Sequence, residues 1–373
     1  MNISTKHSQR AAPLALACLL ACSALARADD RTYTVHNLVS DGSIAADHTD
    51  PNLINAWGVA FNPFGVVWLT ANGTGKSTLY DGQGNVQALV VDIPTPTEAT
   101  GGAPTGIVFN ASTSATSFAI TSGTATGASK FLFATEDGVI AGWAPSVSST
   151  KAIVAVDNST KTGAIYKGLA IGAGGTGQLL YATDFHNGRV DVFDATFAAA
   201  TLPSGAFTDP NLPSGYAPFG IQAINGDIFV TYAKQVPGSD DEADGAGLGV
   251  VDVYDPNGVL LDRVATRGPL NAPWGIAMAP AGFGAASNSI LIGNFGDGRI
   301  NVYDGKNYEF RGQLRSDHGR AIQIEGLWGL AFGSGFANQP VNTLFFAAGP
   351  GGESHGLYGR IDAPAGANNN HDN

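Results

Sequence analysis

A short pattern of apolar positions around a glycine recurs along the chain. Six segments carry Gly at their second position and alternating apolar residues after it: WGVAF, TGIVF, KGLAI, FGIQA, WGIAM and WGLAF, which begin at residues 57, 105, 167, 219, 274 and 328. Successive segments therefore start 48 to 62 residues apart. Self-similarity at a period of this length is the signature of a repeat protein in which each repeat is one supersecondary unit.

Each repeat continues with two further apolar runs separated by a polar turn. In the fifth repeat these runs are SILIG at residues 289–293 and RINVY at residues 299–303. Their β-branched and aromatic residues, with a period of two, predict strands joined as hairpins. The region after Phe197 in the third repeat gives no clear fourth strand, whereas four other repeats do, at residues 86–93, 152–157, 259–266 and 310–316.

The last repeat has one strand fewer than the others, and the N-terminal region carries a spare one. The sixth repeat ends after residues 357–361, and residues 32–39 read TYTVHNLV. Pairing of these two segments would cover the last open sheet edge. The sequence therefore predicts an all-β fold, a six-bladed β-propeller over residues 29–362 closed by the N-terminal strand. Residues 363–373 are poor in apolar side chains and are expected to form a disordered tail.

The segment GTGKST at residues 73–78 resembles a phosphate-binding loop only in part. Such a loop needs a Gly five positions before the Gly of its GK pair, and Thr70 stands there. The residues that follow, TLY, read as a strand rather than as the start of a helix. The third and fifth repeats have HNGR and GDGR at the same place. We therefore interpret the segment as a hairpin turn whose glycines adopt positive φ.

The first 28 residues have the features of a secretory signal peptide. Lys6 and Arg10 precede an apolar run at residues 11–21, and Ala-Arg-Ala at residues 26–28 offers a cleavage site. A lipoprotein anchored at Cys22 is the alternative, although the preceding residues match a lipobox poorly. Both cysteines of the chain, Cys18 and Cys22, lie in this segment, so the mature chain has no disulfide. We expect a periplasmic or extracellular protein.

The charge of the mature chain excludes several partners. Without the first 28 residues, 16 Lys and Arg face 31 Asp and Glu, a formal charge of −15. Such a surface repels nucleic acid and anionic lipid headgroups. The mature chain has no run of apolar residues long enough to predict a membrane span. We expect a monomer that binds no nucleic acid and has no membrane span.

Several phrases of the sequence resemble known propeller proteins. The segments HNGRVDVFD at residues 186–194 and GDGRINVYD at residues 296–304 resemble NHL-type repeats. More specific are EDGVIAGW, YKGLA, GYAPFG, APWGIA, GNFGDG and GLWGL, which begin at residues 136, 166, 215, 272, 293 and 326. Together they resemble an uncharacterised family of exported bacterial propellers, some of which end in a PEP-type sorting signal. This chain lacks that signal, so the resemblance implies release, and it implies no particular activity.

Propeller topology predicts where a site must lie. Loops that lead into the first strand of each blade, and loops that join its second and third strands, emerge on one face around the central channel. We call this the loop face, and we expect a ligand there. The candidate ligand-binding residues on it are Trp57, Asn72, Tyr166, Lys167, Tyr216, Trp274, Asp297, Glu325 and Trp328.

Most of these residues also have a structural interpretation. The tryptophans stand at equivalent repeat positions, which favours packing between blades over stacking on a ligand. Asp184 and Asp297 lie at Gly-containing turns, where carboxylates commonly accept backbone N–H groups. The acidic insertion at residues 239–245 could bind a hard cation such as Ca²⁺, although its spacing does not match an EF-hand, or could form a solvated lid.

Two classes of function remain open. The first is a binding or scaffold module that presents the loop face to a glycan, a peptide or a protein. The second is a lactonase-like hydrolase with Ca²⁺ or another divalent cation at the channel mouth. Its candidate metal ligands are Glu136, Asp184, Asn294 and Glu353, and its candidate catalytic bases are His186 and His355. The sequence offers no G-x-S-x-G nucleophile elbow and no closely spaced histidine pair for zinc.

Overall fold

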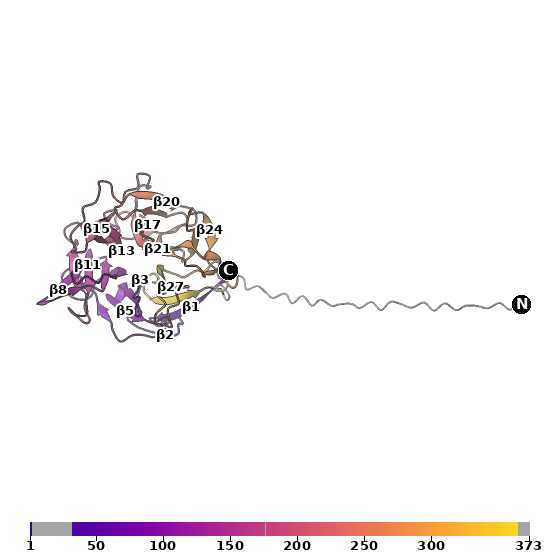
Figure 1. Ribbon diagram of the computed structural model, residues 1–373, viewed down its shortest axis with the longest axis horizontal. Coiled ribbons are helices and arrows are strands. Elements are labelled where there is room, and N and C mark those ends of the chain that lie inside the picture. The colour runs from indigo at the N-terminus through magenta and orange to yellow at the C-terminus, as the bar shows by residue number, and fades with distance from the viewer. Residues whose placement is uncertain (2–31, 176, 365–373) are drawn as a thin grey trace.

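Six β-sheets arranged around a central axis form the molecule (Figure 1). This computed structural model describes Met1, residues 32–175 and residues 177–364. Within that part of the chain the only helical elements are two 3-10 turns, η1 (Asn72–Thr74) and η2 (Gly284–Ala286). No helix there is long and apolar enough to cross a membrane. The prediction of a six-bladed β-propeller is confirmed. Residues 2–28 of the predicted signal peptide, and the predicted tail from residue 365 onward, lie outside the described residues.

Each blade is an antiparallel sheet whose first strand lies nearest the axis. Blades one and two are β3 (Ala56–Phe61), β4 (Val67–Ala71), β5 (Lys76–Tyr80) and β6 (Val91–Asp92), then β7 (Pro104–Phe109), β10 (Phe131–Thr135), β11 (Val139–Trp143) and β12 (Ile153–Asp157). Blades three and four are β13 (Tyr166–Gly174), β14 (Gly177–Asp184) and β15 (Arg189–Asp194), then β16 (Tyr216–Ile224), β17 (Asp227–Gln235), β19 (Val250–Tyr254) and β20 (Leu260–Thr266). Blades five and six are β21 (Pro273–Met278), β22 (Ser289–Asn294), β23 (Ile300–Asp304) and β24 (Phe310–Gln313), then β26 (Leu327–Phe332), β27 (Thr343–Ala348), β28 (Leu357–Asp362) and β1 (Thr32–Ser40).

Five short strands lie outside this plan. β2 (His48–Thr49) and β25 (Arg315–Ser316) both pair in parallel with β1. β18 (Glu242–Ala243) pairs with the end of β17, so the acidic insertion folds back as a hairpin. β8 (Ala119–Ser122) and β9 (Ala125–Ala128) form a separate hairpin within the loop between β7 and β10. The sequence pattern did not predict this last hairpin, because its Ala, Ser, Thr and Gly residues show no apolar alternation.

The repeated glycines bring the inner strands into backbone contact. A Cβ atom built on any of the six would lie 2.0 to 2.8 Å from a backbone atom of the next blade. The contacts run from Gly58 to Thr105, Gly106 to Leu169, Gly168 to Phe219, Gly220 to Trp274, Gly275 to Trp328 and Gly329 to Trp57, which completes the circle. Only Gly permits so close an approach between two backbones.

Buried threonine hydroxyls add hydrogen bonds between blades at the same level. The Oγ1 atom of Thr70 accepts from the backbone N–H of Gly58 at 2.7 Å and donates to the carbonyl of Thr105 in the next blade at 2.6 Å. Thr183 donates to the carbonyl of Phe219 at 2.6 Å in the same way. Thr70, which excludes a phosphate-binding loop, therefore joins the first two blades. The GTGKST segment is the predicted hairpin turn, with Gly75 at a φ of 67°.

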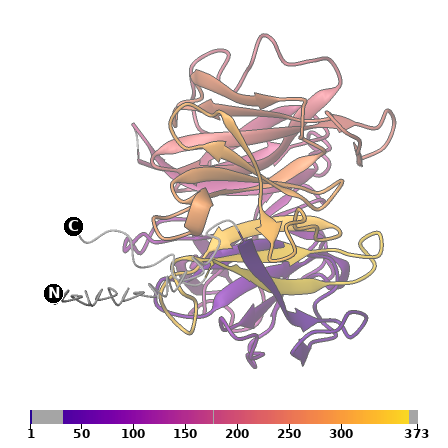
Figure 2. The same ribbon diagram turned by 90° about the vertical axis from the view of Figure 1, so that its right-hand side faces the viewer.

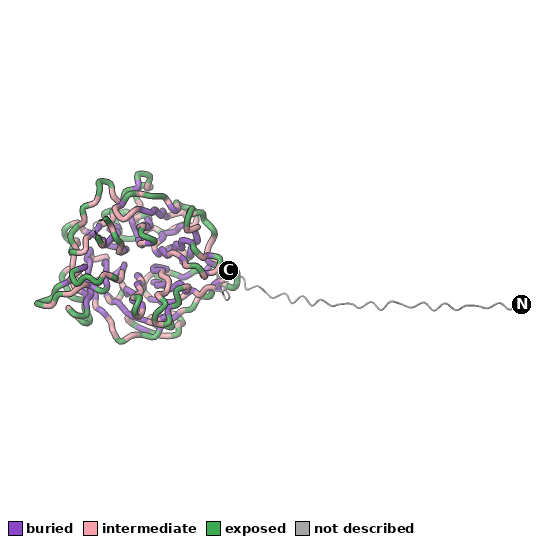
Figure 3. The backbone as a smooth tube through the Cα atoms, viewed as in Figure 1, coloured by how far each residue is buried: buried purple, intermediate pink, exposed green. Residues whose placement is uncertain are grey.

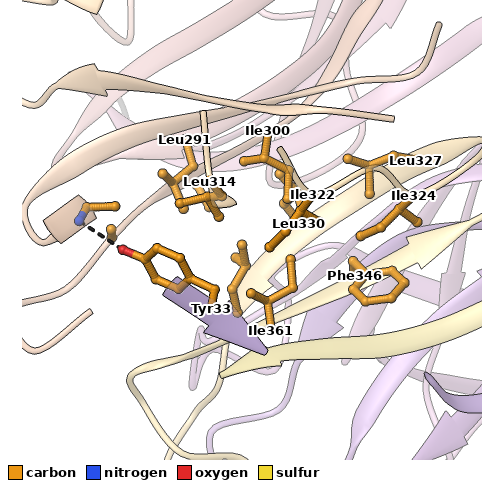
Figure 4. Close-up of a cluster of buried hydrophobic side chains, with 14 of the residues drawn as sticks. Tyr33, Leu291, Ile300, Leu314, Ile322, Ile324, Leu327, Leu330, Phe346 and Ile361 are labelled. Carbon is orange, nitrogen blue, oxygen red and sulfur yellow. Dashed lines mark hydrogen bonds between the residues drawn. The ribbon is translucent and has the colours of Figure 1, made fainter. Parts of the chain in front are cut away.

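The core consists of the apolar layers between blades, and exposed residues lie mainly on the loops and outer strands (Figure 3). Figure 2 shows β1 beside the C-terminal strands of blade six. β1 pairs antiparallel with β28, with Val35 opposite Ile361. Tyr33 of β1 lies in a buried cluster with Leu314, Phe346 and Ile361 (Figure 4). That the N-terminal strand holds the ring closed stays a prediction.

The glycine contacts predict that a single methyl group will strain the ring. In Gly168→Ala the new Cβ would lie 2.8 Å from the carbonyl oxygen of Phe219, whereas in Gly172→Ala, on the same strand, the nearest atoms lie at 3.4 Å. We expect Gly168→Ala to lower the free energy of unfolding by about 1 to 3 kcal/mol and Gly172→Ala to leave it nearly unchanged. Denaturant titration of both variants measures this, and equal stabilities would contradict the role given to the repeat glycine.

Tyr33 predicts how strongly β1 is tied to the neighbouring blade. Its hydroxyl donates to the carbonyl of Phe283 at 2.8 Å and accepts from the N–H of Ala286 at 3.0 Å, both in blade five. Tyr33→Phe leaves these two buried groups unpaired, so we expect a loss of about 1 to 3 kcal/mol in unfolding free energy. Tyr303→Phe is the matched control, because the buried Tyr303 hydroxyl has no partner among the described residues. A loss of the same size in both variants would contradict the prediction.

Candidate functional site

Three tryptophans fill the central channel beneath the loop face. The rings of Trp57 and Trp328 stack with centroids 3.7 Å apart, and Trp274 meets both edge-on. Trp57 and Trp328 are buried, and Trp274 is half-buried with its N–H donating to the carbonyl of Lys167 at 3.0 Å. The indole N–H of Trp57 is buried and has no hydrogen-bond partner among the described residues. The rings of Trp57, Trp274 and Trp328 therefore form an aromatic floor beneath the side chains of the loop face.

Lys167 extends over this floor. Its ammonium lies 5.3 Å from the ring centroid of Trp57, a cation–π distance, and 2.5 Å from Oε1 of Glu136. The side chain is almost fully buried, with 4% of its surface exposed. A buried ammonium requires a paired carboxylate, because leaving it unpaired costs several kcal/mol. Lys167 and Glu136 are therefore a structural unit that joins blades three and two.

Two amides extend the network across the channel. Asn72 donates to Glu136 at 2.8 Å, and Asn55 donates to Asn72 at 3.3 Å and to Glu353 at 2.9 Å. The Oδ1 atom of Asn55 accepts from the indole N–H of Trp328 at 3.1 Å, which fixes the amide to the floor. We define the channel-mouth cluster as Asn55, Asn72, Glu136, Lys167, Glu242 and Glu353.

Backbone strain occurs at two members of this cluster. Asn55 has a φ of 48° and Glu353 a φ of 68°. Left-handed conformations are unfavourable for residues other than Gly, and such strain concentrates at functional sites. Asn adopts this region more readily than Glu, so Glu353 is the more unusual of the two.

The third carboxylate comes from the acidic insertion. The hairpin pairs Glu242 with Gln235, and the side chain of Glu242 comes close enough to Lys167 for their charges to interact. Burial raises the pKa of Glu242 to about 7, although Lys167 opposes this shift. Burial also raises the pKa of Glu353, with a further contribution from Glu136. Burial alone would lower the pKa of Lys167, but Glu136 and Glu242 hold it above its ordinary value.

The cluster therefore carries more negative than positive charge. Three carboxylates surround one ammonium, so the full ionised set has a formal charge of −2. The raised pKa values of Glu242 and Glu353 have desolvation as their main cause, which Lys167 partly offsets and the neighbouring carboxylates reinforce. An arrangement of this kind favours an additional cation.

The structure divides the four candidate metal ligands between two settings. Glu136 and Glu353 belong to the cluster, whereas Asp184 and Asn294 are buried in turns. Asp184 accepts from Asn187 at 2.7 Å, and Asn294 donates to the carbonyl of Pro269 at 2.8 Å. Within the described residues, no three His, Cys, Asp or Glu side chains are grouped so as to hold a metal ion.

The two candidate catalytic histidines lie toward the rim. Nδ1 of His186 is 3.5 Å from Asp240 of the acidic insertion, and Nδ1 of His355 is 2.8 Å from Asp41. Both side chains are roughly half exposed. Neither side chain has a hydrogen bond to the channel-mouth cluster within the described residues, although the backbone carbonyl of His355 accepts from the N–H of Asn55 at 2.9 Å.

The remaining candidates of the loop face are dispersed. The hydroxyl of Tyr166 donates to Asp191 at 2.8 Å, away from the channel, and Tyr216 packs beside the core between blades three and four. Asp297 and Glu325 line a cleft of about 390 Å³ between blades five and six. The loop face thus has two acidic areas.

Sequence reasoning named four of the six cluster residues as candidates and missed the particular role of two. Asn55 is not among the residues that the sequence singles out, and Glu242 is present there only as one of the carboxylates of the acidic insertion. The signal for Asn55 was its place two residues before the repeat tryptophan. No local signal distinguishes Glu242 from its neighbours, because its direction depends on the pairing of β18 with β17.

Comparison with known proteins gives a fold and a family. No protein-family model matches the chain. The soluble aldose sugar dehydrogenase from Escherichia coli superposes with a TM-score of 0.53, covering 89% of this chain and 100% of that one at 13% identity, which shows the fold alone. One uncharacterized protein of Acanthamoeba polyphaga mimivirus is 34% identical over 338 residues, covering 88% of this chain and 80% of its own length. A second from the same virus is 32% identical over 306 residues, covering 80% and 79% respectively. The chain belongs to the family of these two viral proteins.

Proposed function

We propose that the protein is an exported binding module whose channel-mouth cluster takes up a basic side chain of a peptide or protein partner. The observation that carries this proposal is the convergence of loops and strands from five blades on one network of charged and amide side chains, built over an aromatic floor. Blade one provides Asn55 and Asn72, and blades two, three, four and six provide Glu136, Lys167, Glu242 and Glu353.

The charge of the cluster selects the ligand. An incoming ammonium or guanidinium would supply the positive charge that three carboxylates and one lysine lack. Charge-assisted hydrogen bonds to carboxylates are the strong ones, and a guanidinium can bond two oxygens at once. The acidic insertion beside the cluster, with Asp240, Asp241 and Asp244, would attract the same partner at longer range.

The same geometry supports a peptide or protein partner over a glycan. Sugars are bound on exposed aromatic faces, and the rings of Trp57 and Trp328 are covered. The indole ring of Trp57, which lies below the Lys167 ammonium, carries an unpaired N–H. This N–H would donate to an acceptor that enters with the ligand, such as a peptide carbonyl. Loop-borne recognition on a rigid frame is a common use of this kind of fold.

The geometry supports a binding module better than a divalent-metal-dependent hydrolase. Lys167 already provides the cation at the point where the carboxylates meet, and Asp184 and Asn294 are engaged in turns. A hydrolase of the lactonase type would need several oxygen ligands around one ion. The candidate bases His186 and His355 pair with rim aspartates instead.

Export is part of the proposal and rests on the sequence. Residues 1–28 would be removed as a signal peptide, which gives a periplasmic or extracellular protein beginning at Asp29. Mass spectrometry of the protein recovered from cells would identify the new N-terminus. A diacylglyceryl group on Cys22 would assign the lipoprotein alternative.

Titration with a defined basic peptide tests the binding function. The probe is an octapeptide of alternating Arg and Gly, and its partner replaces each Arg by neutral citrulline. We expect the Arg peptide to bind and Glu242→Gln or Glu353→Gln to weaken it about tenfold, because each variant loses a charged hydrogen-bond partner. Glu309→Gln, on an exposed loop between β23 and β24, is the matched control for total charge. Equal binding of the two peptides, or equal weakening by the control, would contradict the proposal.

The pKa of Glu242 predicts the pH dependence of that binding. A carboxylate whose pKa is raised to about 7 in the folded protein is protonated below that pH, so affinity for the Arg peptide should rise between pH 6 and pH 8. The groups that act on Glu242 are Lys167, Glu353 and Asp241. Calorimetry across this range should show a flatter profile for Glu242→Gln. Parallel profiles for both proteins would show that Glu242 is not the titrating group.

A further inference from the structure

Blade three has three strands, whereas every other blade of the described chain has a fourth. After β15 the chain turns back and pairs with this strand over three residues only, Ala198 to Ala200. Ala198 and Ala200 hydrogen-bond to the backbones of Asp194 and Val192 at 2.8 Å, and Phe193 bridges Ala199. The chain then crosses toward blade four, where Phe207 donates to the carbonyl of Gly258 at 2.8 Å.

The crossing segment is fixed in its new position. The ring of Phe207 is buried and packs against Tyr181 and Tyr254 at centroid distances of 5.6 and 5.2 Å. Asp209 follows it and forms an ion pair with Arg263 of β20. This segment therefore cannot return to β15 without opening the layer between blades three and four.

The abandoned edge leaves backbone groups unpaired. The register of β15 against β14 is regular, and the carbonyl of Val192 points outward because it accepts from Ala200. Alternation along a strand then points both backbone groups of Val190 outward as well. Neither the N–H nor the carbonyl of Val190 has a hydrogen-bond partner within residues 32–175 and 177–364. Exposed edges of this kind are templates for a further strand.

A groove of about 440 Å³ runs along this edge. One wall is β15 with Asn158, Lys161 and Thr162, and the other contains Ala200, Leu202 and Phe207. The exposed Lys161 has no ion pair among the described residues, whereas Arg189 is engaged with Asp191 at 2.7 Å. The groove thus offers backbone hydrogen bonds, an apolar wall and one free positive charge.

We propose that this groove binds an extended, acidic segment of a partner protein, which completes blade three as its fourth strand. Between Arg189 and Asp191 the edge has room for about three residues, or about 10 Å of strand. Strand addition obtains affinity from main-chain hydrogen bonds and specificity from alternate side chains. Here one apolar side chain would face Leu202 and a carboxylate would face Lys161. The site is on the outside of the ring and does not depend on the function proposed for the channel mouth.

Hydrogen exchange tests whether the edge is open. The Val190 amide should exchange much faster than the amide of Val302, which lies on β23 of blade five and is covered by β24. Equal protection of the two amides in the free protein would overturn the proposal before any ligand is added.

A peptide array tests the occupant. The probes are acetylated pentapeptides with central Glu and every combination of Ala, Val, Leu and Thr around it. We expect a subset to bind, to protect the Val190 amide, and to lose binding when a backbone N–H of the peptide is methylated. Val190→Pro should weaken binding about tenfold, since it removes an outward N–H without breaking the pairing to β14. Lys161→Glu should weaken it about two- to fivefold, and Lys151→Glu, an exposed control, should have no effect.

The other possible outcomes of these experiments also decide whether a partner strand binds at this edge. If no peptide binds the wild-type protein, or if bound peptides tolerate both N-methylation and Lys161→Glu, the proposal is wrong. If Val190→Pro does not fold, the methylated peptides and Lys161→Glu still decide. A concentration-dependent dimer in sedimentation that Lys161→Glu and Val190→Pro abolish would assign the edge to a second copy of the chain and overturn the partner proposed here.

Discussion

The contact of each inner strand with the next through a glycine is the constraint on which the rest of the structure depends. At every one of the six contacts a Cβ would lie within 2.8 Å of a backbone atom. Because the last contact joins Gly329 to Trp57, the six interfaces form a closed set, and none can widen without opening the others. Buried hydroxyls such as those of Thr70 and Thr183 use the same proximity to bond one blade to the next. The fold is therefore set at the axis, and the outer strands are free to vary.

That freedom explains the irregular features at the periphery. Blade three lacks a regular outer strand, a hairpin of β8 and β9 is inserted in blade two, and β1 from the other end of the chain serves as the outer strand of blade six. Each difference occurs away from the glycine contacts. Side chains near the axis cannot vary as the outer strands do, because the repeat tryptophans must fit in the channel together. They do so by stacking at 3.7 Å and by edge contacts, and the loops above them meet at one point.

The sequence was sufficient for the repeat and insufficient for the site, and the reason is physical. The repeat is encoded locally, because Gly, apolar alternation and turn residues act within a few positions of one another. The outcome after Phe197, where no strand could be predicted, agrees with a chain that leaves the sheet at Ala200. The site is encoded in contacts between residues as far apart as Asn55 and Glu353. Asp184 and Asn294 occupy repeat positions similar to that of Glu136, yet their side chains satisfy their own turns, which no single-sequence pattern distinguishes.

The channel-mouth cluster lowers the stability of the fold, and this loss of stability bears on its function. Glu353 holds a left-handed backbone conformation, and the raised pKa of Glu242 means that ionising this carboxylate near neutral pH opposes folding. An apolar plug would have filled the same space without strain or buried charge, as the indoles below already do. The closed ring can tolerate these local penalties because its glycine contacts and blade cores lie on other residues. Under the binding function proposed here, a ligand that relieves the charge would account for a network that is strained, charged in excess and placed where five blades converge.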